Sequence, residues 1–212
     1  MGIKEKLADA LADKQKEQVF HGILKSRLVL LGYTVAVPEP DIGEDLWIGE
    51  SVDKSRDRRP RTVYRAQLKS ARTTSKKEQG KCRHYDTNEY VTNFQYGLWQ
   101  PRFVYVFGLY DEAKDDKFHI GCVPSLYFRK ILERYPFDRD PYPGVQGDRY
   151  MMQFYVGHPD FFYRLNIRRG ATFDVSAFFG PIEYGLKVAS ERTPCPDLQD
   201  VSLRPHVRRK RG

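Results

Sequence analysis

The sequence contains few cysteines and no long apolar segment. Its three cysteines, Cys82, Cys122 and Cys195, are odd in number and form no C-x-x-C pair. This arrangement supports neither a disulfide framework nor a zinc site, and a reducing cytoplasm is the simplest setting. No run of roughly 18 apolar residues is present, so we expect no membrane span. A charged N-terminal segment leading into an apolar stretch is also missing, so we expect no secretory signal.

Internal repeats and a glycine-rich phosphate loop are absent as well, which argues against repeat arrays and P-loop nucleotide hydrolases. Charge and aromatic side chains are abundant instead, at 30% and 14% of the 212 residues, a composition typical of a globular protein. The formal net charge of +8 suits an anionic partner. We expect one domain over residues 1–190 and a polar, basic tail over residues 191–212.

The hydrophobic pattern predicts an ordered series of helices and strands. An apolar stripe with helical spacing predicts a helix over residues 3–31, ended by Gly32. Strands are expected over residues 33–37, 45–50, 63–70, 102–110, 117–123 and 150–156. A helix is expected over 125–133, and a short amphipathic helix or turn over 90–96. Short helical or turn segments are expected over 160–164 and 174–179. The order predicts an α/β sandwich with a central mixed sheet flanked by helices, and an aromatic C-terminal extension over residues 136–190.

Asp45 and the segment Gln67–Leu68–Lys69 form the most informative pattern. The strand over residues 63–70 alternates, so that Arg65, Gln67 and Lys69 share one face. Asp45 opens the preceding strand, 22 residues before Gln67, and neighbouring strands joined by a loop of that size would bring the two together. A carboxylate and an amide oxygen can hold a hard divalent cation, with the lysine ammonium next to its bound water.

These residues resemble the PD-(D/E)XK nuclease superfamily in its Gln-x-Lys variant, as in Mrr-like restriction nucleases and Holliday-junction-resolvase-like domains. The resemblance covers residues 15–135 and implies a restriction-endonuclease-like fold and a Mg²⁺-dependent endonuclease, with Mn²⁺ able to substitute. It assigns Asp45, Gln67, Lys69 and Glu17 as catalytic residues, and Asp45, Glu17, Gln67 and the carbonyl of Leu68 as metal ligands. At position 67 the chain has Gln, where the superfamily's name pattern has Asp or Glu.

Several acids compete for the metal site. Asp41, Glu39 and Glu44 lie near Asp45 but also suit turn or capping positions, and Asp41 is the second choice after Asp45. Glu17 lies on the edge of the apolar stripe of the first helix. It is therefore either a third metal oxygen, as the resemblance implies, or a solvated carboxylate paired with Lys14.

The segment from residue 54 to residue 83 is strongly basic. It contains twelve Lys and Arg residues and two acids, a net charge of +10 that exceeds that of the whole chain. Because this basic segment flanks the predicted site on both sides, we expect it to bind nucleic-acid phosphates. The candidate contacts are Arg56, Arg58, Arg59, Arg65, Arg72, Lys76, Lys77, Lys81 and His84.

The sequence therefore predicts a metal-dependent nuclease that hydrolyses phosphodiester bonds in DNA, in host defence or DNA processing. Two alternatives remain open. Because position 67 lacks an acid, the chain also fits a catalytically decayed nucleic-acid-binding module. Its aromatic C-terminal part fits an interaction or assembly protein, and a homodimer is compatible with either.

Overall fold

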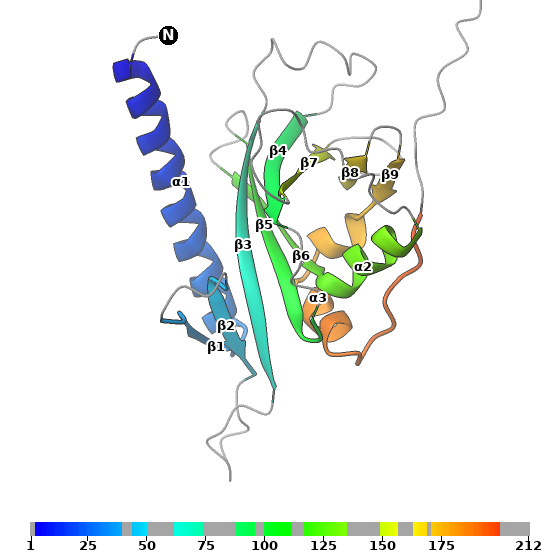
Figure 1. The fold of residues 1–212 in the computed structure, drawn as a ribbon. Coiled ribbons are helices and arrows are strands. Elements are labelled where there is room, and N and C mark those ends of the chain that lie inside the picture. Colours follow the sequence, from blue (N-terminus) through cyan, green and yellow to red (C-terminus); the bar gives the residue numbers. More distant parts are fainter. Residues whose placement is uncertain are drawn as a thin grey trace, which may run out of the picture.

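The computed structural model describes residues 3–39, 44–50, 62–73, 88–95, 100–111, 117–134, 149–156, 163–168 and 171–199. Helices pack against a central sheet, so the predicted α/β architecture is confirmed (Figure 1). No helix in these ranges is long and apolar enough to cross a membrane.

Five strands form a mixed sheet in the order β1-β2-β3-β5-β6. Only β3 and β5 are parallel, and the other neighbouring pairs are antiparallel. Strand β3 lies in the middle and is the longest, with 11 residues. Each strand confirms an expected one: β1 (Thr34–Ala36), β2 (Leu46–Gly49), β3 (Val63–Thr73), β5 (Phe103–Asp111) and β6 (Lys117–Pro124).

Helix α1 (Ile3–Leu30) confirms the predicted N-terminal helix and runs along one side of this sheet (Figure 1). Its Phe20, Leu24 and Leu28 are fully buried, and their spacing of four places them on one face of the helix. They form one core cluster with residues of β2, β3 and β5. The helix ends at Gly32, whose φ of 87° is the left-handed conformation expected of a C-cap glycine.

A second set of strands extends the sheet from the far end of β3. Strands β4 (Asn88–Gln95), β7 (Arg149–Val156), β8 (Tyr163–Arg168) and β9 (Ala171–Asp174) are antiparallel neighbours in that order. They join the first five strands through Arg72 and Thr73 of β3, which pair with β4. The C-terminal extension therefore continues the sheet.

Two local predictions in this second set were wrong. Residues 90–96 were expected to form a short helix or turn, but residues up to 95 lie in strand β4, which pairs with β7 along its whole length. Tyr90 and Phe94 are four residues apart, a spacing that places side chains together on a helix and also on one face of a strand. Residues 163 and 164, expected in a helical or turn segment, begin strand β8. Strand pairing, which is not a local property, decides both cases.

Helices α2 and α3 complete the layers. Helix α2 (Ser125–Arg134) was predicted, and its Tyr127, Phe128 and Ile131 pack against Phe103, Tyr105 and Phe107 of β5 in a second core cluster. Helix α3 (Ile182–Ala189) was not predicted. It packs so closely on β6 that a Cβ at Gly185 would lie 2.1 Å from the carbonyl oxygen of Cys122. The expected short helical segment near residue 174 is the 3-10 helix η2 (Ser176–Phe179), and Asp174 accepts a hydrogen bond from the Ser176 amide at 2.9 Å.

The chain after α3 returns over the molecule up to residue 199. Lys130 of α2 donates a hydrogen bond to the carbonyl of Cys195 at 2.9 Å, and Asp174 donates its amide to the carbonyl of Gln199 at 3.1 Å. Cys195 and Leu198 pack against the second core cluster. The first part of the expected tail is therefore held against α2 and β9. The basic residues from Arg204 onward lie outside the described residues.

Candidate functional site

Strands β2 and β3 separate at Asp45, and its side chain continues the pairing. The last paired residues are Leu46 and Ala66, and the amide of Asp45 donates to the carbonyl of Ala66 at 2.8 Å. One position further, the Oδ2 atom of Asp45 accepts a hydrogen bond from the backbone amide of Leu68 at 2.6 Å. The carboxylate thus occupies the place of the next strand residue and is fixed beside the Gln67–Lys69 segment, as the sequence predicted.

The alternation of β3 also agrees with the prediction. Tyr64, Ala66 and Leu68 are buried in the cluster that contains the α1 residues. Gln67 and Lys69 therefore lie on the opposite face of the sheet from α1. Their parallel partners in register are Tyr105 and Phe107, respectively. Both polar residues therefore lie beside an aromatic residue of the neighbouring strand β5.

Gln67 is the most unusual residue on this face. It is only 6% exposed, and its Oε1 atom is buried without a hydrogen-bond partner among the described residues. Burying a polar oxygen without a partner costs free energy, and the large majority of such atoms in proteins are satisfied. A carbonyl-type oxygen that is buried and unsatisfied is suited to a water molecule or a hard cation.

The acid next to Asp45 has a different role. Glu44 is buried, and its two oxygens accept hydrogen bonds from Trp47 Nε1 at 2.7 Å and Arg65 NH1 at 3.2 Å. Arg65 also donates to the side-chain oxygen of Gln100. Each oxygen of Glu44 already accepts a hydrogen bond, so Glu44 is a poor candidate for a metal ligand. Arg65, expected to contact phosphate, is held in an ion pair.

The contact described for Glu17 is with His21, on its own helix. The Glu17 side chain is 50% exposed, and its Oε1 atom is 4.0 Å from Nε2 of His21, one helical turn away. The buried residues of α1 pack on the face opposite Gln67 and Lys69. The described contacts thus place Glu17 with His21 and do not bring it to Asp45. Glu39 is exposed, beyond strand β1.

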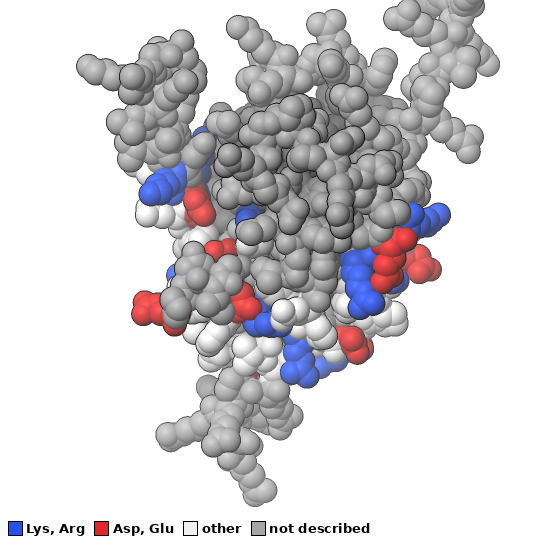
Figure 2. Space-filling view, viewed as in Figure 1, with Lys and Arg blue, Asp and Glu red and all other residues white. Residues whose placement is uncertain are grey.

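Most of the predicted phosphate contacts lie outside the described residues. These are Arg56, Arg58, Arg59, Lys76, Lys77, Lys81 and His84, together with the competing acid Asp41. Arg72 is placed by its backbone in β3, where it pairs with Val91. On the face drawn in Figure 2, the described Lys and Arg side chains are interspersed with Asp and Glu.

The side-chain oxygens of Asp45 and Gln67 are of the type that could bind a magnesium ion. Asp45 and Gln67 offer one carboxylate and one amide oxygen, the hard ligands that Mg²⁺ prefers. Mg²⁺ is commonly held by one or two carboxylates, with waters and substrate phosphates completing its shell. Within the described ranges, no group of three or more His, Cys, Asp and Glu side chains could hold a metal.

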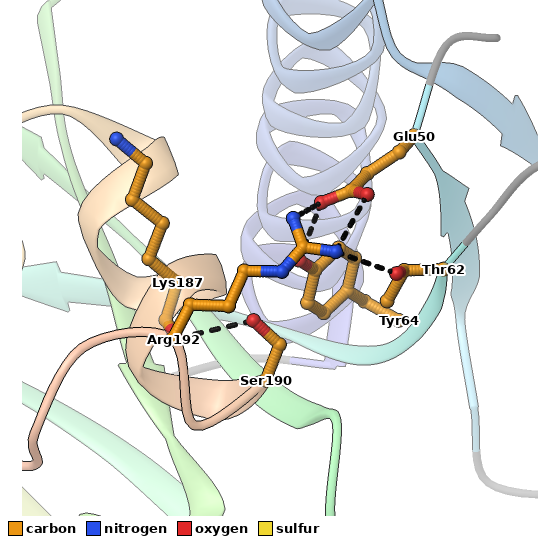
Figure 3. A network of polar contacts seen from close by, with 6 residues as sticks. All are labelled: Glu50, Thr62, Tyr64, Lys187, Ser190 and Arg192. Atoms are coloured by element: carbon orange, nitrogen blue, oxygen red, sulfur yellow. Dashed lines mark hydrogen bonds and ion pairs between the residues drawn. The ribbon is translucent and has the colours of Figure 1, made fainter.

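An ion-pair network that the sequence analysis missed fixes the start of β3. Glu50, directly after β2, accepts hydrogen bonds from both terminal nitrogens of Arg192, at 2.5 and 3.0 Å (Figure 3). Tyr64 donates to Glu50 at 2.9 Å, and Arg192 also donates to Thr62 Oγ1 at 3.0 Å. Burial alone would raise the pKa of Glu50, but the hydrogen bonds from Arg192 and Tyr64 hold that pKa below its ordinary value. No local pattern reveals a pair 142 residues apart.

Comparison with protein-family models, with curated proteins and with solved structures finds no match to this chain. The resemblance to the PD-(D/E)XK superfamily therefore depends on the chain's own residues.

Proposed function

We propose that this protein is a metal-dependent nuclease of the restriction-endonuclease-like type that hydrolyses phosphodiester bonds in DNA. The observation that carries the proposal is the position of the Asp45 carboxylate, which accepts a hydrogen bond from the backbone amide of Leu68, the residue after Gln67, whose own side-chain oxygen is buried and unpartnered. An aspartate fixed where two strands separate, next to a Gln-x-Lys strand, is the arrangement that the resemblance implies.

Asp45, Gln67 and the carbonyl of Leu68 would hold Mg²⁺, and Mn²⁺ is expected to substitute. The ion would supply charge neutralisation at a non-bridging phosphate oxygen and a more acidic water. The hydrogen bond from Leu68 orients the Asp45 carboxylate, so that less freedom is lost on binding. The unsatisfied Gln67 oxygen gains a partner, which removes a cost already present in the fold.

Lys69 would act on the attacking water and on the phosphate. It lies two residues beyond Gln67 on the same face of β3, and its register partner on the neighbouring strand is Phe107 of β5. Its ammonium would orient the water that attacks the phosphorus and stabilise the charge that develops on the phosphoryl oxygens. From the resemblance, the products are expected to be a 5′-phosphate and a 3′-hydroxyl. The basic segment over residues 54–83 would position the DNA backbone.

The test is a cleavage assay with plasmid, branched and single-stranded DNA in Mg²⁺, Mn²⁺ or EDTA. We expect metal-dependent cleavage that Lys69→Ala lowers by about two or more orders of magnitude, the usual scale for a positioned catalytic group. Asp45→Asn should abolish the metal response, and Lys187→Ala, which removes an exposed cation from α3, should leave cleavage unchanged. Unchanged cleavage by a folded Lys69→Ala protein would end the assignment of this site.

One observation favours a second candidate, a nucleic-acid-binding module without catalysis. Asp45 is the single carboxylate at the described site, because Glu44 is engaged by Trp47 and Arg65. A site with one negative charge holds Mg²⁺ weakly. This candidate predicts salt-dependent DNA binding that EDTA does not alter, with no cleavage in either metal.

A further inference from the structure

A pocket separate from Gln67 and Lys69 opens at the start of β3. Its volume is about 610 Å³, within the range of small-molecule sites. Val63, Pro101 and Ala189 give it an apolar part, and Arg65, Arg102 and Glu191 give it charged side chains. The lining therefore comes from β3, from the turn before β5 and from the end of α3, where Figure 3 shows Ser190, a further lining residue.

Two of the lining residues have a costly backbone conformation. Arg102 and Glu191 have φ values of 60° and 61°, and no other non-glycine residue in the described ranges has a positive φ. Arg102 is the third residue of a turn in which the Phe103 amide donates to the carbonyl of Gln100 at 3.2 Å. With proline at its second position, such a turn favours glycine or asparagine at the third.

Glu191 occupies the equivalent position at the end of α3. The amides of Glu191 and Arg192 donate to the carbonyls of Val188 and Lys187 at 3.1 and 3.0 Å. This is the Schellman ending of a helix, in which glycine is the usual residue at the left-handed position. Two positions suited to glycine thus carry charged side chains, and both line the same pocket. Strained positions of this kind cluster at functional sites.

Both side chains are available to a ligand. Arg102 and Glu191 are exposed, and within the described residues neither forms an ion pair, with the other or with a third group. Arg65 is different, because Glu44 and Gln100 already occupy its guanidinium. The pocket thus presents one unpaired cation, one unpaired anion and an apolar part. A complementary ligand has an anionic group, a hydrogen-bond-donating edge and a flat apolar body.

We infer that this pocket binds a nucleotide, with Arg102 on its phosphate and Glu191 accepting hydrogen bonds from the edge of its base. The base lies against Val63, Pro101 and Ala189. Guanine is the preferred base, because its N1–H and amino group are adjacent donors that a carboxylate accepts together. The choice of a nucleotide as the ligand rests on the proposed nuclease function. Arg65 lines the pocket and lies two residues from Gln67 and four from Lys69 on β3, which is about 7 and 13 Å along the strand.

Calorimetric titration with guanosine 5′-monophosphate tests the inference, with guanosine, inorganic phosphate and cytidine 5′-monophosphate as comparison ligands. We expect guanosine 5′-monophosphate to bind most tightly. Arg102→Gly keeps a residue that accepts a positive φ and removes the whole side chain with its guanidinium, so it should weaken binding by roughly tenfold or more. Glu191→Gln should remove the preference for guanine over cytosine. Lys187→Ala is the control for charge and should bind like the wild type, since Lys187 is exposed on α3 outside the pocket lining.

The outcomes separate this inference from the nuclease proposal. Lys69→Ala should bind guanosine 5′-monophosphate normally even where cleavage is lost. Equal affinity of the wild type and a folded Arg102→Gly protein would overturn the pocket assignment, as would the absence of any nucleotide binding, whatever the cleavage result. Nucleotide binding that depends on Arg102 in a protein that never cleaves DNA would support the pocket and refute the nuclease.

Discussion

Glu50 and Arg192 are 142 residues apart in the sequence and form a two-point ion pair, with nitrogen–oxygen distances of 2.5 and 3.0 Å (Figure 3). Glu50 follows β2, and Arg192 follows α3. Thr62 and Tyr64, at the start of β3, bond to the same pair. The ion pair therefore joins the C-terminal segment to the two strands that carry Asp45 and Gln67.

Arg192→Ala should destabilise the fold by about 1 kcal/mol, because it removes a charged hydrogen-bond donor from Glu50, with the effect reduced by the exposure of Arg192. For a chain of this size, the midpoint of thermal unfolding should fall by about 2–4 °C. Arg129→Ala is the matched control. It breaks the exposed pair with Glu133 at 2.8 Å, four residues away, and should change stability by less than about 0.5 kcal/mol. Equal effects of the two variants would contradict a special role for the Glu50 pair.

The pH dependence of stability should reveal the same pair. The pKa of Glu50 is lower in the folded protein than its ordinary value of 4.5, so the unfolded chain binds more protons near that pH. The contribution of Glu50 is therefore fully present above about pH 4.5 and is lost as the pH falls through the folded pKa. Denaturant titrations of the wild type and Glu50→Gln between pH 7 and pH 3 should show a stability difference that shrinks with acidification. A constant difference would show that Glu50 does not titrate with folding.

The sequence predicted the central part of the fold because that part is governed by local patterns. The alternation of residues 63–70 placed Gln67 and Lys69 on one face, and the contact between Asp45 and Leu68 agrees with the expected neighbouring strands. The C-cap at Gly32 was equally local. These features depend on the period of side chains along one element, which is read directly from the sequence.

Other features depend on contacts between distant segments and were not predicted. Strand β4 exists because β7 pairs with it, and the spacing of Tyr90 and Phe94 fits both helix and strand. Arg65, which was expected to contact phosphate, forms an ion pair with Glu44. Helix α3 did have a local signal, since Ile182, Leu186 and Ala189 follow helical spacing and are buried. The helix has only 8 residues and begins directly after Gly180 and Pro181, and both features obscured this signal.

Gln67→Glu tests whether the buried oxygen belongs to a metal site. A carboxylate at a position that is 6% exposed should destabilise the fold by about 2 kcal/mol in EDTA, because burial penalises its charged form. Excess Mg²⁺ should recover this loss by binding the folded state. Gln67→Met is the matched control, since it keeps the length of the side chain without the oxygen and should show no response to Mg²⁺. Thermal unfolding with and without Mg²⁺ measures both; a Gln67→Glu protein whose melting temperature ignores Mg²⁺ would argue against a metal at this position.

The two Schellman endings offer a reciprocal test of backbone strain. Gly32 and Glu191 occupy the same position after α1 and α3, with φ values of 87° and 61°. Glu191→Gly should stabilise the fold by about 1 kcal/mol, because glycine has no Cβ to oppose a positive φ. Gly32→Ala should destabilise it by a similar amount. Arg102→Gly should act like Glu191→Gly, so the variant expected to weaken nucleotide binding should also unfold at a higher temperature. Destabilisation by both glycine variants would show that their side chains stabilise the fold.

The position of Glu17 leads to the last prediction. The sequence resemblance makes Glu17 the second carboxylate, and its removal would then raise the Mg²⁺ concentration for half-maximal cleavage by roughly tenfold, or about 1.4 kcal/mol. The structure instead places Glu17 near His21 on a helix that packs on the face opposite Gln67 and Lys69. We therefore expect Glu17→Ala to shift the metal titration by less than about threefold.

Asp41→Asn should be measured together with Glu17→Ala, because the sequence analysis made Asp41 the second choice after Asp45. If the described site is complete, both variants should retain the wild-type metal titration, and substrate phosphate should supply the remaining charge. In that case, the apparent Mg²⁺ affinity should rise with DNA concentration, because ion and substrate bind together. A tenfold shift caused by Asp41→Asn alone would assign the second carboxylate to Asp41. The same shift caused by Glu17→Ala would show that α1 moves toward Asp45 when DNA binds.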